Sequence, residues 1–245
     1  MLQGCSPRGG ILNLRQRHSL PFTVKVVTTK SELDSVVALR SAAYLRHNAP
    51  AADKVRFPEE EDEREDAVIL VARSKLEGGV VGTMRINSNL NTPLQLESVM
   101  ALPVPFNQSR CAEFMRLGVV SGSSGRLVSS ALAKAGYEIC VAMKMDFVFV
   151  CSRPPVDTMY RGYKFDDLLK GEKLDLHYAP GVPHFVLCIP VAEAPARWLL
   201  DSGPVYRFFI ETEHPDLEID YDEVKRRFAR RAPADVSSEA VAAAV

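Results

Sequence analysis

The chain has 245 residues, a length that favours one domain with short appendages. Apolar residues make up 47%, enough for a buried core, and the formal net charge of −1 excludes a general electrostatic attraction to nucleic acid. No apolar run approaches the ~20 residues that a membrane-spanning helix needs, and the five cysteines lack metal-ligand spacing. We therefore expect a cytoplasmic protein with reduced thiols, without a transmembrane segment, a metal ion or another bound cofactor.

The chain begins with an extension and continues into a strand and a helix. Residues 1–20 contain Gly and Pro breakers with little periodicity, which predicts a poorly ordered segment. Apolar and polar residues alternate over 22–26 and indicate a strand. A capping box at 29–32 opens a helix that runs to about Tyr44 and carries Arg40 on its apolar face. Such an arginine either reaches the rim of the core or points into a cleft to bind a carboxylate.

An acidic run at 57–66 leads directly into a buried strand at 67–72. Charge runs are usually solvated loops, and we expect this of most members of the run. One or two of its carboxylates must nevertheless lie at the mouth of the sheet, because the strand follows without a break. The Gly-Gly turn at 75–79 predicts a hairpin, and its return strand at 80–86 carries Arg85 near the end.

The strand predicted at 111–119 is unusual because it is apolar but carries Glu113 and Arg116. It runs into a small-residue loop at 121–125 and then into helical spacing over 126–144. Residues three apart on a regular strand point to opposite faces. Glu113 and Arg116 therefore share a site only if a β-bulge intervenes, and otherwise they form a structural ion pair at a sheet edge.

The remaining elements complete an α/β pattern. Apolar strands are predicted at 147–151 and 184–190, with a short helix at 157–165 between them. The order of elements predicts one mixed sheet covered by helices. The chain has no Walker-type phosphate loop, no dinucleotide glycine fingerprint, no nucleophile elbow and no histidine-rich metal pattern.

Five short motifs define the candidate site. They are Arg40-x-x-x-Tyr44 in the first helix, an acidic pair best matched by Glu59 and Asp62, the strand Val81-Gly-Thr-Met-Arg85, Glu113-Phe-Met-Arg116, and Tyr160–Phe165 with a displaced Gly162. Together they resemble the GNAT acyltransferase superfamily over roughly residues 22–191, and more closely its N-acyl amino acid synthase and acyl-homoserine-lactone synthase branches. The resemblance implies an α/β fold with a GNAT-like mixed, mostly antiparallel central sheet flanked by helices.

The resemblance also divides the chain. It implies an extension at 1–20, a GNAT-like acyltransferase domain at 21–215, and a C-terminal helix with a disordered tail at 216–245. Two departures refine it. The Trp of the lactone-synthase branch is absent near Asn48, which leaves the N-acyl amino acid synthases closer. The loop that grips the coenzyme A pyrophosphate in ordinary acetyltransferases is replaced by 121–126, which implies a long-chain acyl donor carried by acyl carrier protein or coenzyme A.

Individual roles follow from the resemblance and from the chemistry of amide formation. The catalytic candidates are Glu113, as general base toward the amine directly or through a water, and Arg116, which orders the charges. The candidates for binding the acceptor are Arg40, Tyr44, Asp62 and Arg85. The candidates for binding the acyl donor are Leu117, Val119, Gly122, Ser123, Gly125, Arg126 and Tyr160. Backbone amides near Leu117–Val119 would polarise the thioester, and Tyr160 either protonates the leaving thiolate or belongs to the core.

The expected function is N-acyl transfer from an acyl carrier protein or coenzyme A thioester to the amine of an amino acid or similar small molecule. One alternative is an autoinducer synthase of the acyl-homoserine-lactone type, and another is a non-catalytic GNAT-like module that binds a ligand. The apolar residues of 127–143, with Phe147 and Phe149, either line an acyl tunnel or form ordinary core. The basic segment at 225–231 either meets an acidic acyl carrier protein or is a solvated helix face.

Overall fold

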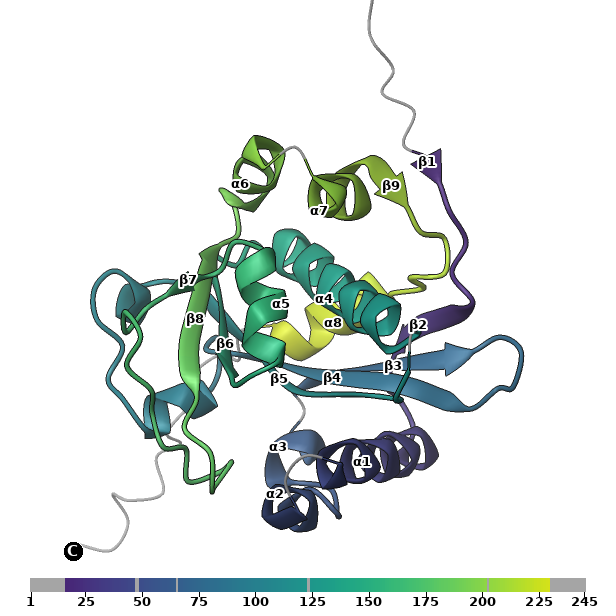
Figure 1. Ribbon diagram of the computed structural model, residues 1–245, viewed down its shortest axis with the longest axis horizontal. Helices are drawn as coiled ribbons and strands as arrows, with labels where there is room; N and C mark the ends of the chain where they lie inside the picture. Colours follow the sequence, from purple (N-terminus) through teal and green to yellow (C-terminus); the bar gives the residue numbers. More distant parts are fainter. Residues whose placement is uncertain (1–15, 47–48, 65, 123, 202, 230–245) are drawn as a thin grey trace, which may run out of the picture.

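The computed structural model describes residues 16–46, 49–64, 66–122, 124–201 and 203–229, and it shows a seven-stranded sheet with helices on both sides (Figure 1). Across the sheet, the strands are β2 (Phe22–Val26), β3 (Val68–Ser74), β4 (Val80–Ser88), β5 (Cys111–Val119), β6 (Phe147–Ser152), β8 (Phe185–Pro190) and β7 (Asp166–Asp167). Neighbours are antiparallel except β5 and β6, which are parallel. This confirms the predicted α/β class with a mixed, mostly antiparallel sheet.

The helices form two layers (Figure 1). One side of the sheet carries α1 (Lys30–Leu45), α2 (Ala49–Lys54) and α3 (Glu60–Glu63). The other side carries α4 (Ser124–Ala142), α5 (Val156–Gly162), α6 (Ala194–Leu200), α7 (Pro204–Tyr206) and α8 (Tyr221–Phe228). Short 3-10 turns, η1 (Gln95–Ser98) and η2 (Phe106–Gln108), lie between β4 and β5, and a π-helical turn, η3 (Arg207–Glu211), follows α7.

Local sequence signals set several of these elements. The Glu32 amide donates to the Thr29 hydroxyl at 3.2 Å, and the Glu32 carboxylate accepts from the Thr29 amide at 3.3 Å, so the predicted capping box opens α1. The predicted hairpin joins β3 and β4, and Gly78 adopts a φ of +70° in its turn, a backbone conformation that favours glycine. The predicted helical stripe of α4 packs into the main core through buried residues that include Leu132 and Ile139.

The two ends of the described chain pack against this unit. Residues 1–15 and 230–245 lie outside the described residues, so the predicted disorder there stays a prediction. Within the predicted extension, β1 (Gln16–Arg17) pairs with β9 (Thr212–Glu213), and Leu20 is buried. Near the predicted boundary at 215, the Val24 amide donates to the Asp216 carbonyl at 2.8 Å. The segments on both sides of the predicted boundaries therefore contact the rest of the fold.

Candidate active site

β5 departs from a regular strand at Arg116. Its pairing with β4 shifts register there, and Arg116 has a φ of +53°. Met115, on the face of β5 that carries Glu113, lies opposite Arg85, and the side chains of Arg85 and Arg116 both donate to Glu59. The β-bulge that a shared site requires is therefore present, and it brings Arg116 to the side of the sheet that carries Glu113.

A glycine in the same strand lets α1 lie close above the bulge. A Cβ atom at Gly118 would be 3.3 Å from the Cα of Arg40 and 3.6 Å from the Cβ of Ala43. Larger residues here would push the helix away from the sheet. The fold therefore needs a small residue at this position to bring Arg40 over the strands.

Five side chains from α1, the segment around α3, β4 and β5 form a closed network of charges, which we call the ionic network: Arg40, Glu59, Asp62, Arg85 and Arg116. The two terminal nitrogens of Arg40 donate to Asp62 at 2.7 and 3.0 Å. Arg85 donates to Asp62 at 2.9 Å and to Glu59 at 3.1 Å. Arg116 donates to Glu59 at 2.6 and 2.5 Å. Two members of the acidic run, at the positions that the resemblance indicated, therefore turn inward.

The guanidinium groups hold both carboxylates ionised. Burial alone would raise the pKa of Asp62, but the hydrogen bonds and charges of Arg40 and Arg85 outweigh it and lower the pKa to about 2. In Glu59 the effect of burial is likewise outweighed, mainly by Arg116, and the pKa is lowered. Arg116 pairs with Glu59 rather than with Glu113, so the two charged residues of β5 have different partners.

Glu113 lies beside this network, but its carboxyl group differs from those of Glu59 and Asp62 in its hydrogen bonds and in its pKa. Its side chain is fully buried, and one carboxylate oxygen accepts from the Leu96 amide of η1 at 3.2 Å. The other oxygen, Oε1, has no hydrogen-bond partner among the described residues. Burial raises the pKa of Glu113 to about 7, against smaller opposing contributions from the Leu96 amide and Arg85. A carboxylate with this pKa exchanges protons near neutral pH, as a general base must.

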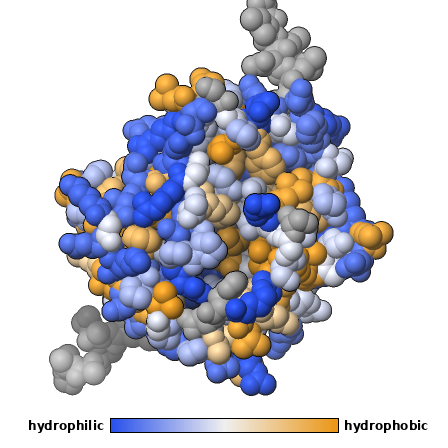
Figure 2. Space-filling view, viewed as in Figure 1, coloured by the Kyte–Doolittle hydropathy of each residue, from blue (hydrophilic) through white to orange (hydrophobic). Residues whose placement is uncertain are grey.

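The sheet opens immediately beyond Glu113. β5 and β6 pair only from Cys111 to Glu113, opposite Phe147 to Phe149, although both strands continue. A cavity of about 310 Å³ lies between the diverging strands and is bordered by α1, α2, α4, α5 and the segment before β8. Figure 2 shows a hollow near the centre of this face, with apolar surface at its base and hydrophilic surface around it. Glu113 therefore lies at the apex of a cleft that passes between two strands.

The predicted site residues fall into two groups according to whether they line this cavity. Those that line it are Tyr44, Arg116, Leu117, Val119 and Tyr160. Arg40, Asp62, Arg85 and Glu113 lie behind its wall, all with fully or almost fully buried side chains. Burial lowers the pKa of Arg116, but its ion pair with Glu59 outweighs this effect and the pKa is raised. The ionic network thus contacts the cavity through Arg116.

The backbone of β5 offers a hydrogen-bond donor at the open edge. The Val120 amide donates to the Val81 carbonyl of β4 at 3.0 Å. Because amide directions alternate along a strand, the N–H and C=O of Val119 point away from β4, toward the gap. The Val119 carbonyl indeed accepts from Arg46 at 2.5 Å. The Val119 N–H is therefore placed to meet an oxygen atom in the cleft.

The small-residue loop leads into the start of α4, as predicted. Ser123 lies outside the described residues. Gly122 is exposed with a φ of +105°, Gly125 is buried, and Arg126 is exposed. A Cβ atom at Gly125 would lie 2.7 Å from the Val120 carbonyl oxygen, so the helix start passes very close to the end of β5. None of these three residues lines the cavity, and their predicted contact with the donor stays a prediction.

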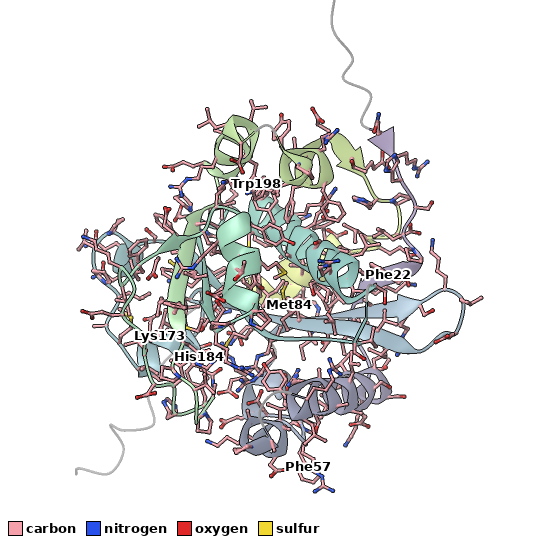
Figure 3. All side chains as sticks on the ribbon, in the orientation of Figure 1. Phe22, Phe57, Met84, Lys173, His184 and Trp198 are labelled. Atoms are coloured by element: carbon pink, nitrogen blue, oxygen red, sulfur yellow. The ribbon has the colours of Figure 1, made fainter. Side chains whose placement is uncertain are left out.

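Several cavity residues carry no motif that sequence reasoning recognised. The Tyr178 carbonyl accepts from Arg116 at 3.2 Å, and its hydroxyl donates to the Cys151 sulfur at 3.7 Å. His184 also lines the cavity, and burial lowers its pKa to about 4, so its imidazole is neutral (Figure 3). Tyr178 lies in an irregular connection whose path no periodicity predicts, which explains why it was missed.

Packing distinguishes between the two alternatives predicted for Phe147 and Phe149. Phe147 and Phe149 contact Phe106, with ring centroids 4.8 and 5.3 Å apart, and neither lines the cavity. They are core residues, not part of an acyl tunnel.

Within the described part of the chain, no group of three or more His, Cys, Asp or Glu side chains is arranged to hold a metal ion. No helix among the same residues is long and apolar enough to cross a membrane.

The fold and the site define an acyltransferase of the GNAT-like class. The family model described as N-acyl amino acid synthase FeeM matches residues 35–183. This is more than half of the chain, and the chain belongs to that family. The comparison with curated protein sequences found no match to this chain.

Solved structures show the same fold. FeeM, an N-acyl amino acid synthase from uncultured soil microbes, is 14% identical with a TM-score of 0.59, covering 74% of this chain and 96% of that one. BjaI, a CoA-dependent acyl-homoserine lactone synthase, is 18% identical with a TM-score of 0.55, covering 84% and 98%. A Lactobacillus plantarum protein assigned as an N-acetyltransferase is 12% identical with a TM-score of 0.50, covering 70% and 99%.

Proposed function

We propose that this protein transfers an acyl group, most simply a long chain, from a thioester to the amine of an amino acid or a similar small acceptor. The observation that carries the proposal is the position and state of Glu113. It is a buried carboxylate with a pKa of about 7 at the apex of the cleft between β5 and β6. An amine can attack a thioester only after losing a proton, and Glu113 is suited to accept it.

The charge of the ionic network supports an acceptor that carries a carboxylate. Three guanidinium groups face two carboxylates that stay ionised, so one positive charge is uncompensated whenever Glu113 is protonated. Arg116 is the member of the network that lines the cavity, so an acceptor there would meet the positive side of the network through Arg116. An amino acid would supply the compensating α-carboxylate and, in its ammonium group, the proton for Glu113.

The chemical steps use Glu113 and the open edge of β5. The acceptor ammonium gives a proton to Glu113, directly or through a water, and its nitrogen then attacks the thioester carbon. The Val119 N–H stabilises the oxygen as charge develops on it. As the amide C–N bond forms, the attacking nitrogen gives its second proton to solvent and the C–S bond breaks. The leaving thiolate takes up a proton from solvent, and Glu113 returns its proton to solvent after the reaction. Burial raises the pKa of Tyr160, so its phenol stays protonated, and we assign it to the apolar wall of the cavity rather than to proton transfer.

The proposed donor is a thioester of coenzyme A or of an acyl carrier protein, and the lining of the cavity supports a long acyl chain. The cavity wall toward α4 and α5 is apolar, with Phe114, Val150 and Met159, which suits an alkyl chain. The basic residues of α8 give no support to a carrier contact there. Lys225 and Arg226 pair within the helix, with Asp222 at 3.1 Å and Glu223 at 2.8 Å.

We also propose that the protein acts in the cytoplasm. Cys111, Cys140, Cys151 and Cys188 are all unpaired thiols. Free thiols are the usual state of cysteine in reducing compartments.

Lipid extracts of cells that overproduce the protein test the proposal. Mass spectrometry of wild-type extracts should show a new N-acyl amino acid that is absent from cells producing the Glu113→Gln variant at equal level. An acyl lactone instead would favour the autoinducer-synthase alternative. We retain this alternative because the chain shares its fold with BjaI, an acyl-homoserine lactone synthase. No new product from a folded wild-type protein would favour a non-catalytic binding module.

A further inference from the structure

The apolar end of the cavity is closed by two aromatic rings. Behind them lies a second, much smaller cavity of about 10 Å³. Phe114 and Tyr160 line both cavities and are the residues that the two linings share. Both side chains are almost fully buried, 4% and 2% exposed. They form a partition within one apolar region of the protein.

The second cavity is apolar but small, with room for about one methyl-sized group. Its other lining residues come from α4, α6, β6, β8 and the segments after α5 and α7: Ala133, Tyr137, Val148, Tyr163, Phe165, Ile189, Trp198 and Phe209. Nearly all of this surface is apolar, and an empty apolar void of this kind has no partners for water. An alkyl chain that passed the partition would meet carbon atoms on every side.

The partition is held in place by its neighbours. A Cβ atom at Gly136 would lie 2.7 Å from the Cζ of Phe114, so the Phe114 ring presses against the backbone of α4. The Tyr160 ring lies edge-on to Phe165, with centroids 5.2 Å apart, and to Tyr163 at 6.2 Å. Neither ring can turn aside without displacing other core residues, so the partition is a fixed wall.

We infer that the rings of Phe114 and Tyr160 form the end wall of the acyl-chain site and set the longest acyl chain that the enzyme accepts. The inference rests on the proposed function, because it assumes that the acyl chain occupies the apolar part of the cavity. A chain one methylene too long meets the wall and must leave its end or its thioester out of place. The specificity constant should then fall about tenfold for each further methylene.

The variant Phe114→Leu opens the wall while keeping an apolar residue in the core. Leucine has roughly three fewer carbon atoms than phenylalanine, so the space beside Tyr160 joins the two cavities. The longest accepted donor should become longer by about two or three methylenes. The measurement is kcat/KM for a series of saturated acyl-CoA donors of increasing length with one acceptor.

Trp198 gives a second readout that does not require turnover. It is the single tryptophan of the chain, it is 2% exposed, and it lines the second cavity. Unreactive acyl-CoA thioethers that carry bromine at the chain end quench a tryptophan only on contact. The longer members of the series should quench Trp198 in Phe114→Leu and leave it bright in the wild type.

Phe22→Leu is the matched control. Phe22 is 2% exposed in the same core but lines neither cavity, and Figure 3 shows it on β2, well apart from Trp198 of α6. This variant should keep the wild-type length limit and the wild-type fluorescence. An equal shift of the limit in both variants would show a general loosening of the core and would overturn the inference.

The outcomes separate this inference from the proposed function. If the wild type acylates an amine but Phe114→Leu keeps the same limit on acyl-chain length, the two rings do not set that limit. The inference is then wrong, whereas the proposed function is unaffected. Quenching of Trp198 in the wild type by the same analogues that quench it in Phe114→Leu would also overturn the inference, because the chain would then pass the two rings without the substitution. If the wild type forms no acylated amine, the proposed function fails, and bromine quenching confined to Phe114→Leu would still support the wall.

Discussion

Glu113 is the residue whose chemistry depends most on its surroundings. A carboxylate in water has a pKa near 4.5 and is a weak base, whereas burial raises the pKa of Glu113 to about 7. The neighbouring carboxylates of Glu59 and Asp62 are held ionised by three guanidinium groups and cannot serve as bases near neutral pH. The environment therefore gives three neighbouring carboxyl groups different pKa values: Glu113 can accept a proton near neutral pH, whereas Glu59 and Asp62 remain negatively charged.

The pH dependence of the reaction follows from this residue. Glu113 accepts a proton only when it is ionised, so kcat/KM should rise with pH and reach half of its plateau at about pH 7. The measurement is the initial rate from pH 5 to pH 9 with one donor and one acceptor. A rate that stays constant between about pH 5 and pH 8 would mean that another group, or solvent, removes the proton.

The same shift predicts a pH dependence of stability. The folded protein keeps a proton on Glu113 that the unfolded chain releases between its ordinary pKa of 4.5 and about 7, so the free energy of unfolding falls as pH rises through this range. Glu113→Gln removes this dependence. Relative to the wild type, the variant should gain about 3 kcal/mol between pH 4.5 and pH 8, measured by urea unfolding at each pH. Parallel curves for both proteins would contradict a raised pKa.

At the scale of elements, the ionic network joins pieces of structure that local sequence does not connect. Arg40 and Asp62 tie α1 to α3, and Glu59 ties α3 to Arg85 of β4 and Arg116 of β5. All five side chains are mostly or fully buried. Loss of one member leaves an unpaired charge away from water, which is far more costly than the loss of a surface pair.

Asp62→Ala should therefore destabilise the protein by about 3–5 kcal/mol, because it leaves Arg40 and Arg85 without their main partner. Asp201→Ala is the control, since Asp201 pairs with Lys164 and its side chain is 61% exposed. The control should change stability by no more than about 1 kcal/mol. Denaturant unfolding of both variants checks the difference, and equal effects would show that the network is not a structural unit.

Local patterns in the sequence predicted much of this arrangement. The capping box of α1, the hairpin between β3 and β4, and the helical stripe of α4 are decided by neighbours in the chain, and the structure confirms them. The need for a bulge followed from the spacing of Glu113 and Arg116. The actual partner of Arg116 did not follow, because Glu59 lies 57 residues away and pairs with it only after α3 packs on the sheet.

The cavity was the least predictable part of the site. Its wall includes Tyr178 and His184, which come from a connection without periodicity and from the start of β8. Their placement depends on where that connection crosses the sheet, and no pattern within it encodes the path. The partition of Phe114 and Tyr160 was likewise hidden, since a buried aromatic residue on a strand or a short helix is interpreted as ordinary core.

At the scale of the whole molecule, the divergence of β5 and β6 makes one opening serve two kinds of substrate. On the side of α1 to α3, the cavity meets Arg116 and Tyr178, beside the charged network. On the side of α4 and α5, it meets apolar residues such as Phe114 and Met159. A charged acceptor and an apolar chain can therefore approach one thioester from opposite faces of the sheet, with Glu113 at the apex between them.

The most direct test of this account is the turnover of purified wild-type and Glu113→Gln protein with an acyl thioester and a mixture of amino acids, followed by mass spectrometry of the amide products. The wild type should form an N-acyl amino acid, and the variant should form it about 10²–10⁴ times more slowly while melting as a folded protein. Equal rates for the two proteins, or no amide from any thioester with a folded wild type, would contradict the central claim.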